Sequence, residues 1–115
     1  MTTTTDIAKK TAVRIGIIAP DETLEAKDEA GLKSSLTDLH EVLIDKRVVR
    51  WELDSIPSRA VAPLVSELAW YVRDEYDVPA AKVQSLQLAQ AEARKELYAQ
   101  SSIPYNGATL EAQYY

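Results

Sequence analysis

The sequence contains no cysteine, so a disulfide framework and a thiolate metal site are both excluded. With only three glycines it has no glycine-rich phosphate loop, and it lacks the nucleophile elbow and the zincin and deaminase signatures. No apolar run approaches the roughly 18 residues that a membrane-spanning helix requires, and residues 1–10 lack the apolar core of a secretory signal. We therefore expect no enzyme, no cofactor and no membrane segment.

Histidine is also scarce, and the single one, His40, has no ligand-forming neighbours. A catalytic or metal-binding histidine on a helix needs partners three or four positions away. Those positions hold apolar residues and one threonine: Leu36, Thr37, Leu43 and Ile44. The serines have no other histidine with which to build a catalytic triad. The sequence thus predicts neither a catalytic site nor a metal site.

Acidic residues outnumber basic ones, and the net charge of −5 is unevenly distributed. The first 20 residues carry three bases, Lys9, Lys10 and Arg14, against one acid, whereas residues 21–54 carry ten acids against five bases. This balance argues against tight, non-specific binding to DNA phosphates, which needs a concentrated basic face. The five acids between positions 21 and 29 lack the alternating spacing of a calcium loop, so we expect them at a helix N-terminus.

The 115 residues are enough for one domain with a modest core, and 46% of them are hydrophobic. Apolar periodicity predicts four helices joined by short links, at residues 5–15, 25–45, 58–76 and 79–101. The predicted fold class is all-α, a small four-helix bundle with an extended connector between the second and third helices and an extended C-terminal tail.

Helix-end residues support the first of these predictions, and a leucine stripe supports the second. Thr4 or Thr5 followed by Asp6 favours a helix start, and Gly16 is suited to a left-handed cap at its end. The second helix is predicted from a leucine stripe with spacings of four, three and four: Leu32, Leu36, Leu39 and Leu43.

The third and fourth helices are predicted from broader apolar faces. The third has the face of a central, buried helix, and Pro63 fits it only within the first turn. Trp70 on this helix is interpreted as a core residue, and Asp77 as a cap beyond it. The fourth carries one stripe at 83, 86, 89, 93 and 97, and a second at 88, 91 and 98. Two stripes predict more than one neighbouring helix.

Residues 47–57, RVVRWELDSIP, favour either a short strand or an extended connector. A strand here has no obvious mate in the chain, so its mate would come from a neighbouring subunit. Trp51 in this segment either covers the core or anchors an interface, and we assign it to a subunit boundary.

Residues 102–115 are apolar and aromatic without a helical or strand period. The relevant side chains are Ile103, Pro104, Tyr105, Leu110, Tyr114 and Tyr115. One interpretation is a frayed terminus. The other is an extended arm, up to about 45 Å long, whose side chains bind another protein chain. We therefore divide the chain into a helical domain, residues 1–101, and a C-terminal arm, residues 102–115.

The order of segments resembles a known family. A capped helix ends in IGI (15–17), an acidic lead enters the leucine-striped DEAGLKSSLTDLHEVL, and a tryptophan-bearing connector reaches IP (56–57). AVAPLVSELAWYVRDEYDV and a helix ending in ELYAQ follow. Over roughly residues 6–100 this resembles the head-tail adaptor proteins of tailed bacteriophages, most of all the podophage tail accessory (head completion) family. Siphophage head-tail connectors are similar. This chain has a much shorter segment after the last helix.

The resemblance implies a structural protein of the virion, made in the host cytoplasm and placed at the head-tail junction. Such adaptors form a twelvefold ring that docks on the portal protein, extends the DNA channel and carries a downstream tail, nozzle or neck protein. The ring encloses DNA without sequence-specific binding. The six arm residues and Trp51 are then expected to contact the portal or a neighbouring subunit.

A second hypothesis is a small helical regulator, either a DNA-binding repressor or an antitoxin. A helix-turn-helix joins its two helices by a turn of three or four residues. The predicted link after Gly16 is longer than that, and the helix that follows it is acidic. Salt-dependent binding to duplex DNA separates the two hypotheses, because a regulator requires it and an adaptor does not.

Overall fold

Residues 2–101 are described in a computed structural model of the chain, and they form the all-α fold that the sequence predicts. The α-helices are α1 (Thr4–Ile15), α2 (Ala26–Asp45), α3 (Val61–Tyr71) and α4 (Ala80–Ser101). Two short 3-10 helices, η1 (Leu53–Ser55) and η2 (Ser58–Ala60), lie between α2 and α3. The predicted arm, residues 102–115, lies outside the described residues.

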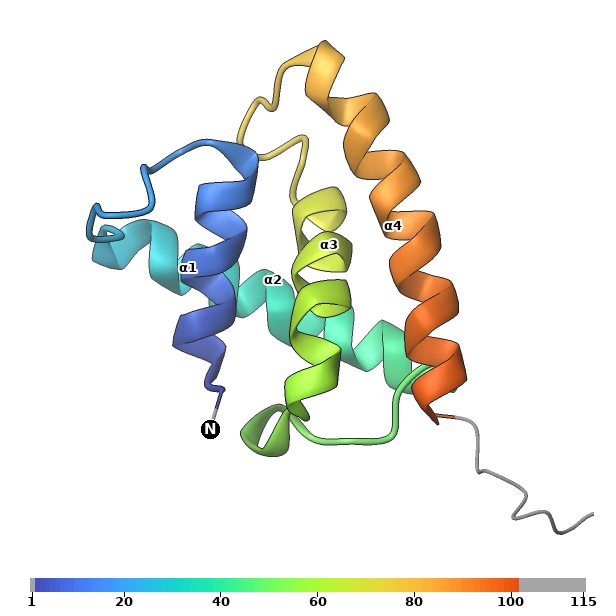
Figure 1. Cartoon of the computed structure of the whole chain (residues 1–115). Coiled ribbons are helices and arrows are strands. Elements are labelled where there is room, and N and C mark those ends of the chain that lie inside the picture. Colours follow the sequence, from blue (N-terminus) through green and yellow to red (C-terminus); the bar gives the residue numbers. More distant parts are fainter. Residues whose placement is uncertain (1, 102–115) are drawn as a thin grey trace, which may run out of the picture.

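Three helices lie side by side in one layer, and the fourth crosses behind them (Figure 1). α3 occupies the middle of the layer between α1 and α4, and α2 runs across the back. α3 packs against all three other helices, and its residues 63–69 are all buried. It is thus the central and most buried helix, as its broad apolar face predicts.

The start of α1 is fixed by a capping box. Thr3 Oγ1 accepts a hydrogen bond from the Asp6 amide at 3.2 Å, and Asp6 Oδ2 accepts one from the Thr3 amide at 3.0 Å. The backbone bond from Thr3 is the chief reason that the pKa of Asp6 lies below its ordinary value. The cap therefore lies at Thr3, just before the predicted Thr4 or Thr5.

Gly16 ends α1 in the left-handed conformation that the sequence predicts, with a φ of 87°. Its amide donates to Ala12 and Val13, and the Ile17 amide donates to the Ala12 carbonyl at 3.1 Å. These bonds are those of a Schellman motif. They satisfy carbonyl groups that the helix itself leaves open.

Arg47 holds the equivalent position after α2, although it is not a glycine. Its φ is 60°, its amide donates to Ile44 at 3.0 Å, and the Val48 amide donates to Leu43 at 2.8 Å. The side chains of Leu43 and Val48 are both fully buried. This second Schellman motif directs the chain into the connector and buries the connector's first apolar residue.

The third helix is shorter than predicted, because α3 ends at Tyr71 and turns occupy residues 72–77. Asp74 and Glu75 follow this end, where the helix dipole disfavours negative charge. The Arg73 side chain instead donates to the Trp70 carbonyl at 2.7 Å. Pro63 lies in the first turn, as its missing amide requires.

Asp77 is not the N-cap of α4, contrary to the prediction. It has a φ of 49°, and the amide of Val78, the next residue, donates to Arg73 at 3.2 Å, which closes the preceding turn. α4 starts only at Ala80, after Pro79. Asp77 therefore ends one segment and does not begin the next.

The connector between α2 and α3 is not a strand, and it is extended only in part, because η1 and η2 lie within it. Among residues 2–101, its ladder pairing is one isolated antiparallel bridge between Ile56 and Thr2. Val48, Val49 and Ile56 are all buried in the core of this chain. The connector thus pairs its backbone with this chain and buries its apolar side chains in this chain. A strand from a neighbouring subunit is not required to pair with it.

Candidate interaction surfaces

Trp51 is held against α2 by His40. The Nε2 atom of His40 donates to the Trp51 carbonyl oxygen at 2.8 Å, and the two ring centroids are 5.7 Å apart. His40 is buried, while Trp51 is partly buried and packs against the core. His40 therefore fixes the connector, and Trp51 covers the core. A place for Trp51 at a subunit boundary stays a prediction.

Trp70 lies at the edge of the core and not within it. It is partly buried, and the guanidinium carbon of Arg73 lies 3.6 Å from the centroid of a Trp70 ring. The interpretation of Trp70 as a core residue is thus correct only in part. A cation–π contact covers the ring where apolar packing ends.

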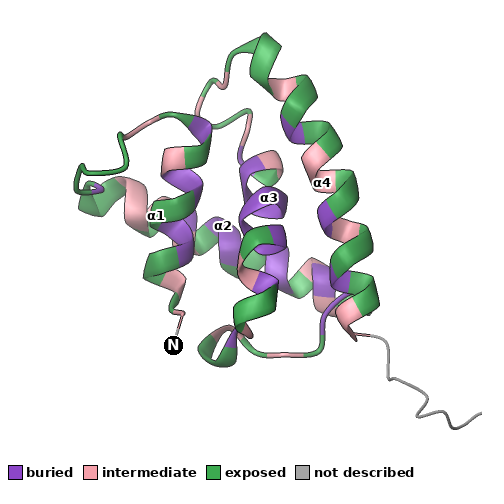
Figure 2. Ribbon diagram, in the orientation of Figure 1, coloured by how far each residue is buried: buried purple, intermediate pink, exposed green. Residues whose placement is uncertain are grey.

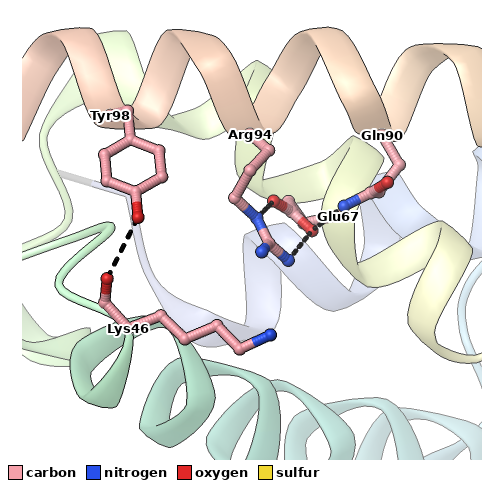
Figure 3. Close-up of polar contacts among 5 residues, drawn as sticks. All are labelled: Lys46, Glu67, Gln90, Arg94 and Tyr98. Carbon is pink, nitrogen blue, oxygen red and sulfur yellow. Dashed lines mark hydrogen bonds and ion pairs between the residues drawn. The ribbon is translucent and has the colours of Figure 1, made fainter.

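A buried carboxylate joins α3 to α4 (Figure 3). Glu67 is 1% exposed, and Arg94 donates to its two oxygens at 2.5 and 3.1 Å. Gln90 adds a third bond at 3.1 Å. The bond to Glu67 is the chief reason that the pKa of Arg94 lies above its ordinary value. The site is fully paired, so it serves α3–α4 packing and offers no free group for chemistry.

The acids expected at a helix N-terminus divide between a loop and α2. Asp28 and Glu29 lie in the first turn of α2, and Glu29 pairs with Lys33 at 3.1 Å. Glu22 accepts a bond from the Ala19 amide in the preceding loop. Within residues 2–101, no group of three or more metal-ligating side chains is placed to hold an ion.

A shallow groove of about 370 Å³ crosses α1, α3 and α4, and we call it the front groove. Its deeper lining is apolar and its exposed rims are charged. The apolar lining includes Val61, Pro63, Val65, Ala89 and Ala93. The exposed charged residues of the lining are Lys10 and Arg14 on α1, and Glu92 and Glu96 on α4.

The front groove faces away from the side where α2 crosses. Ala62 and Ser66 line the groove, and they lie opposite Leu64 and Leu68 on α3, because two residues turn a helix by about 200°. Leu64 and Leu68 are fully buried. No element among residues 2–101 lies over this side of the layer in Figure 1.

The second stripe predicted on α4 is exposed, and Figure 2 shows exposed positions recurring along this helix. Leu88 is 67% exposed and Tyr98 is 48% exposed, whereas Leu86, Ala93 and Leu97 of the first stripe are buried. The Tyr98 hydroxyl donates to the Lys46 carbonyl at 3.2 Å (Figure 3). The described chain thus supplies neighbours for one stripe and leaves Leu88 uncovered.

The outer side of α1 carries a hollow of about 420 Å³, which we call the α1 hollow. Two apolar and three charged residues line it: Val13, Pro20, Asp6, Lys9 and Lys10. The hollow is on the side of α1 that faces away from buried Thr11 and Ile15, two residues from Val13 in each direction.

No family model, curated protein or solved structure matches this chain. The interaction residues predicted at Ile103, Pro104, Tyr105, Leu110, Tyr114 and Tyr115 lie outside the described residues. Within residues 2–101, no helix is both long enough and apolar enough to cross a membrane.

Sequence reasoning missed the features that depend on side chains from separate helices. Glu67 reads as an ordinary acid on α3, and the front groove and the α1 hollow have no local motif. The sequence does contain one indication that Glu67 is paired, because this residue lies among apolar neighbours on a helix predicted to be central. A charged residue in that setting requires a buried partner.

Proposed function

We propose that the chain is a structural, non-enzymatic adaptor of the head-tail junction in a tailed bacteriophage. Its copies form a ring of twelve below the portal protein, which extends the DNA channel and encloses DNA without reading its sequence. The lower side of the ring carries a tail, nozzle or neck protein. Residues of the arm and Trp51 contact the portal or a neighbouring subunit.

The observation that carries the proposal is the surface that the fold leaves open. α2 covers one side of the three-helix layer, and the other side presents the apolar lining of the front groove. Leu88 is 67% exposed on the outer helix. Leu88 and the partly exposed Val61 and Ala89 of the groove are the apolar positions that a partner protein could contact. The order of sequence segments, which resembles the adaptor family, supports the same conclusion.

Co-sedimentation with purified portal rings of the parent phage tests the proposal. We expect the full chain to join the rings, and a chain truncated after Ser101 to remain helical by circular dichroism but to stay unbound. A matched full-length control replaces Tyr105, Tyr114 and Tyr115 by serine, and it should bind as poorly as the truncated chain. If the full chain does not co-sediment with the portal rings, the proposed adaptor function is wrong.

The regulator hypothesis rests on the three exposed bases of α1. The link between α1 and α2 spans residues 16–25, which is longer than the turn of a helix-turn-helix. Fluorescence anisotropy with a labelled DNA duplex at several salt concentrations distinguishes the two functions. Binding that weakens steeply with salt favours the regulator, and no measurable binding favours the adaptor.

A further inference from the structure

The two outer helices of the layer carry different features on their outward sides. α1 and α4 flank α3 (Figure 1), so their outer sides form opposite edges of the molecule. Val13 in the α1 hollow faces away from the core. Leu88 faces outward from α4, because buried Leu86 is two residues before it. One edge therefore has a hollow and the other a projecting leucine.

The net charges beside these features are opposite in sign, although Asp6 lines the hollow and Lys95 lies two turns beyond Leu88. Lys9 and Lys10 line the α1 hollow, and among residues 2–101 Asp6 is the acid that lines it with them. On α4, Glu92 lies one turn beyond Leu88 with its side chain 77% exposed, and exposed Glu96 follows after another turn. Lys95 pairs with Glu92 at 3.5 Å, but both side chains are about three-quarters exposed, so this pair is weak.

We propose that α4 of one copy docks on the α1 hollow of the next copy. Leu88 packs against Val13 and Pro20, while Glu92 and Glu96 meet Lys9 and Lys10. The inference rests on the proposed ring and names the two surfaces that join its subunits. The occupant is a second copy because each edge supplies the apolar and charged partners that the other lacks.

Symmetry makes this contact head-to-tail. A two-fold contact between equal edges would bring α1 onto α1 or α4 onto α4, which would place like charges together. A head-to-tail contact joins unlike edges and leaves one edge free on each side, so further copies add until a ring closes. A ring needs an interface of this kind.

Chemical cross-linking on portal rings tests the contact. Because the sequence has no cysteine, only the introduced cysteines of this chain can react. We introduce Val13→Cys and Leu88→Cys together and treat the assembled protein with a short bismaleimide. The expected product is a ladder that extends beyond the dimer on a denaturing gel. A mixture of the two single variants should stop at the dimer. A dimer from either single variant alone would show a two-fold contact and overturn the proposal.

Charge reversal in the double-cysteine chain tests the electrostatic part of the same contact. We add Lys9→Glu with Lys10→Glu, or Glu92→Lys with Glu96→Lys, to the double-cysteine chain and expect each pair to lower the ladder yield about tenfold. A mixture of the two reversed chains should restore the ladder, because each supplies what the other lost. A matched control is Tyr71→Ala, which removes an exposed aromatic from α3 and should change nothing. If reversal leaves the ladder intact, the edges do not meet.

The outcome separates this contact from the proposed function. Full binding to portal rings without a ladder refutes the contact and leaves the adaptor function standing. A ladder in free solution together with no binding to portal rings supports the contact and refutes the adaptor function.

Discussion

Among the polar residues of this protein, we expect buried Glu67 and its partners to have the largest effect on the free energy of unfolding. A carboxylate that is 1% exposed is tolerated only because Arg94 and Gln90 satisfy both of its oxygens. The cost of removing its charge from water is already incurred in the native fold. Losing the partner would leave that cost uncompensated, whereas losing both charges would remove it.

We expect Arg94→Met to lower the free energy of unfolding by about 3 kcal/mol, since it leaves Glu67 buried without a counter-charge. The double variant Glu67→Leu with Arg94→Met should be more stable than Arg94→Met alone. Urea denaturation followed by circular dichroism measures both. The control is Lys95→Met, whose exposed ion pair with Glu92 contributes no more than about 0.5 kcal/mol. A double variant less stable than Arg94→Met would contradict this account.

Asp6 makes the start of α1 sensitive to acid. Because its pKa is lowered in the folded chain, the charged carboxylate favours folding. This contribution is present above the ordinary pKa of aspartate and is lost as the pH falls through the lower folded value. Carbon-13 titration of the carboxyl group should give a lower pKa in the native chain than in a peptide of residues 1–10, and Thr3→Ala should reduce the difference. Equal values would show that the capping box does not form.

The ends of helices include both the most and the least predictable features of this sequence. Gly16 was predicted to end α1 because glycine enters the left-handed region without strain. The same conformation at Arg47 and Asp77 was not foreseen, because nothing in these side chains requires it. At Arg47 the gain is non-local, since the turn places Val48 and Val49 in the core.

These two helix ends should respond in opposite ways to substitution. Gly16→Ala should cost about 1 kcal/mol, because a β-carbon is strained at a φ of 87°. Among residues 2–101, the added carbon would meet Lys82 Nζ at 3.4 Å, which is an ordinary contact, so the cost is conformational and not steric. Arg47→Gly should instead stabilise by up to about 1 kcal/mol. Thermal and urea unfolding measure both, and a loss of stability in Arg47→Gly would mean that the arginine side chain has an unseen role.

At the scale of the whole molecule, the fold buries its core completely within one chain but leaves one side of the layer open. The buried apolar residues run from Ile7 to Leu97, and they come from every helix and from the connector. The helical domain is therefore expected to fold alone. Association is then a property of its surfaces and its arm, and not a condition for its folding.

A chain truncated after Ser101 should accordingly keep the stability of the full chain to within about 0.5 kcal/mol. Urea denaturation at one protein concentration compares the two, and equal slopes would show that the same surface is exposed on unfolding. A much larger loss would mean that residues 102–115 contribute to the domain itself, and the proposal that the arm binds other chains would have to be abandoned.

The sequence alone determined the all-α class, four helices, the cap at Gly16 and the central place of α3, because these follow from local periodicity and from the chemistry of helix ends. The tertiary structure alone decided that the connector is buried internally, that Glu67 pairs with Arg94, and that Leu88 and the α1 hollow lie on opposite edges. Those outcomes depend on which helix faces meet. A helical period says which side chains share a face, but the partner of that face is set only when all helices pack at once.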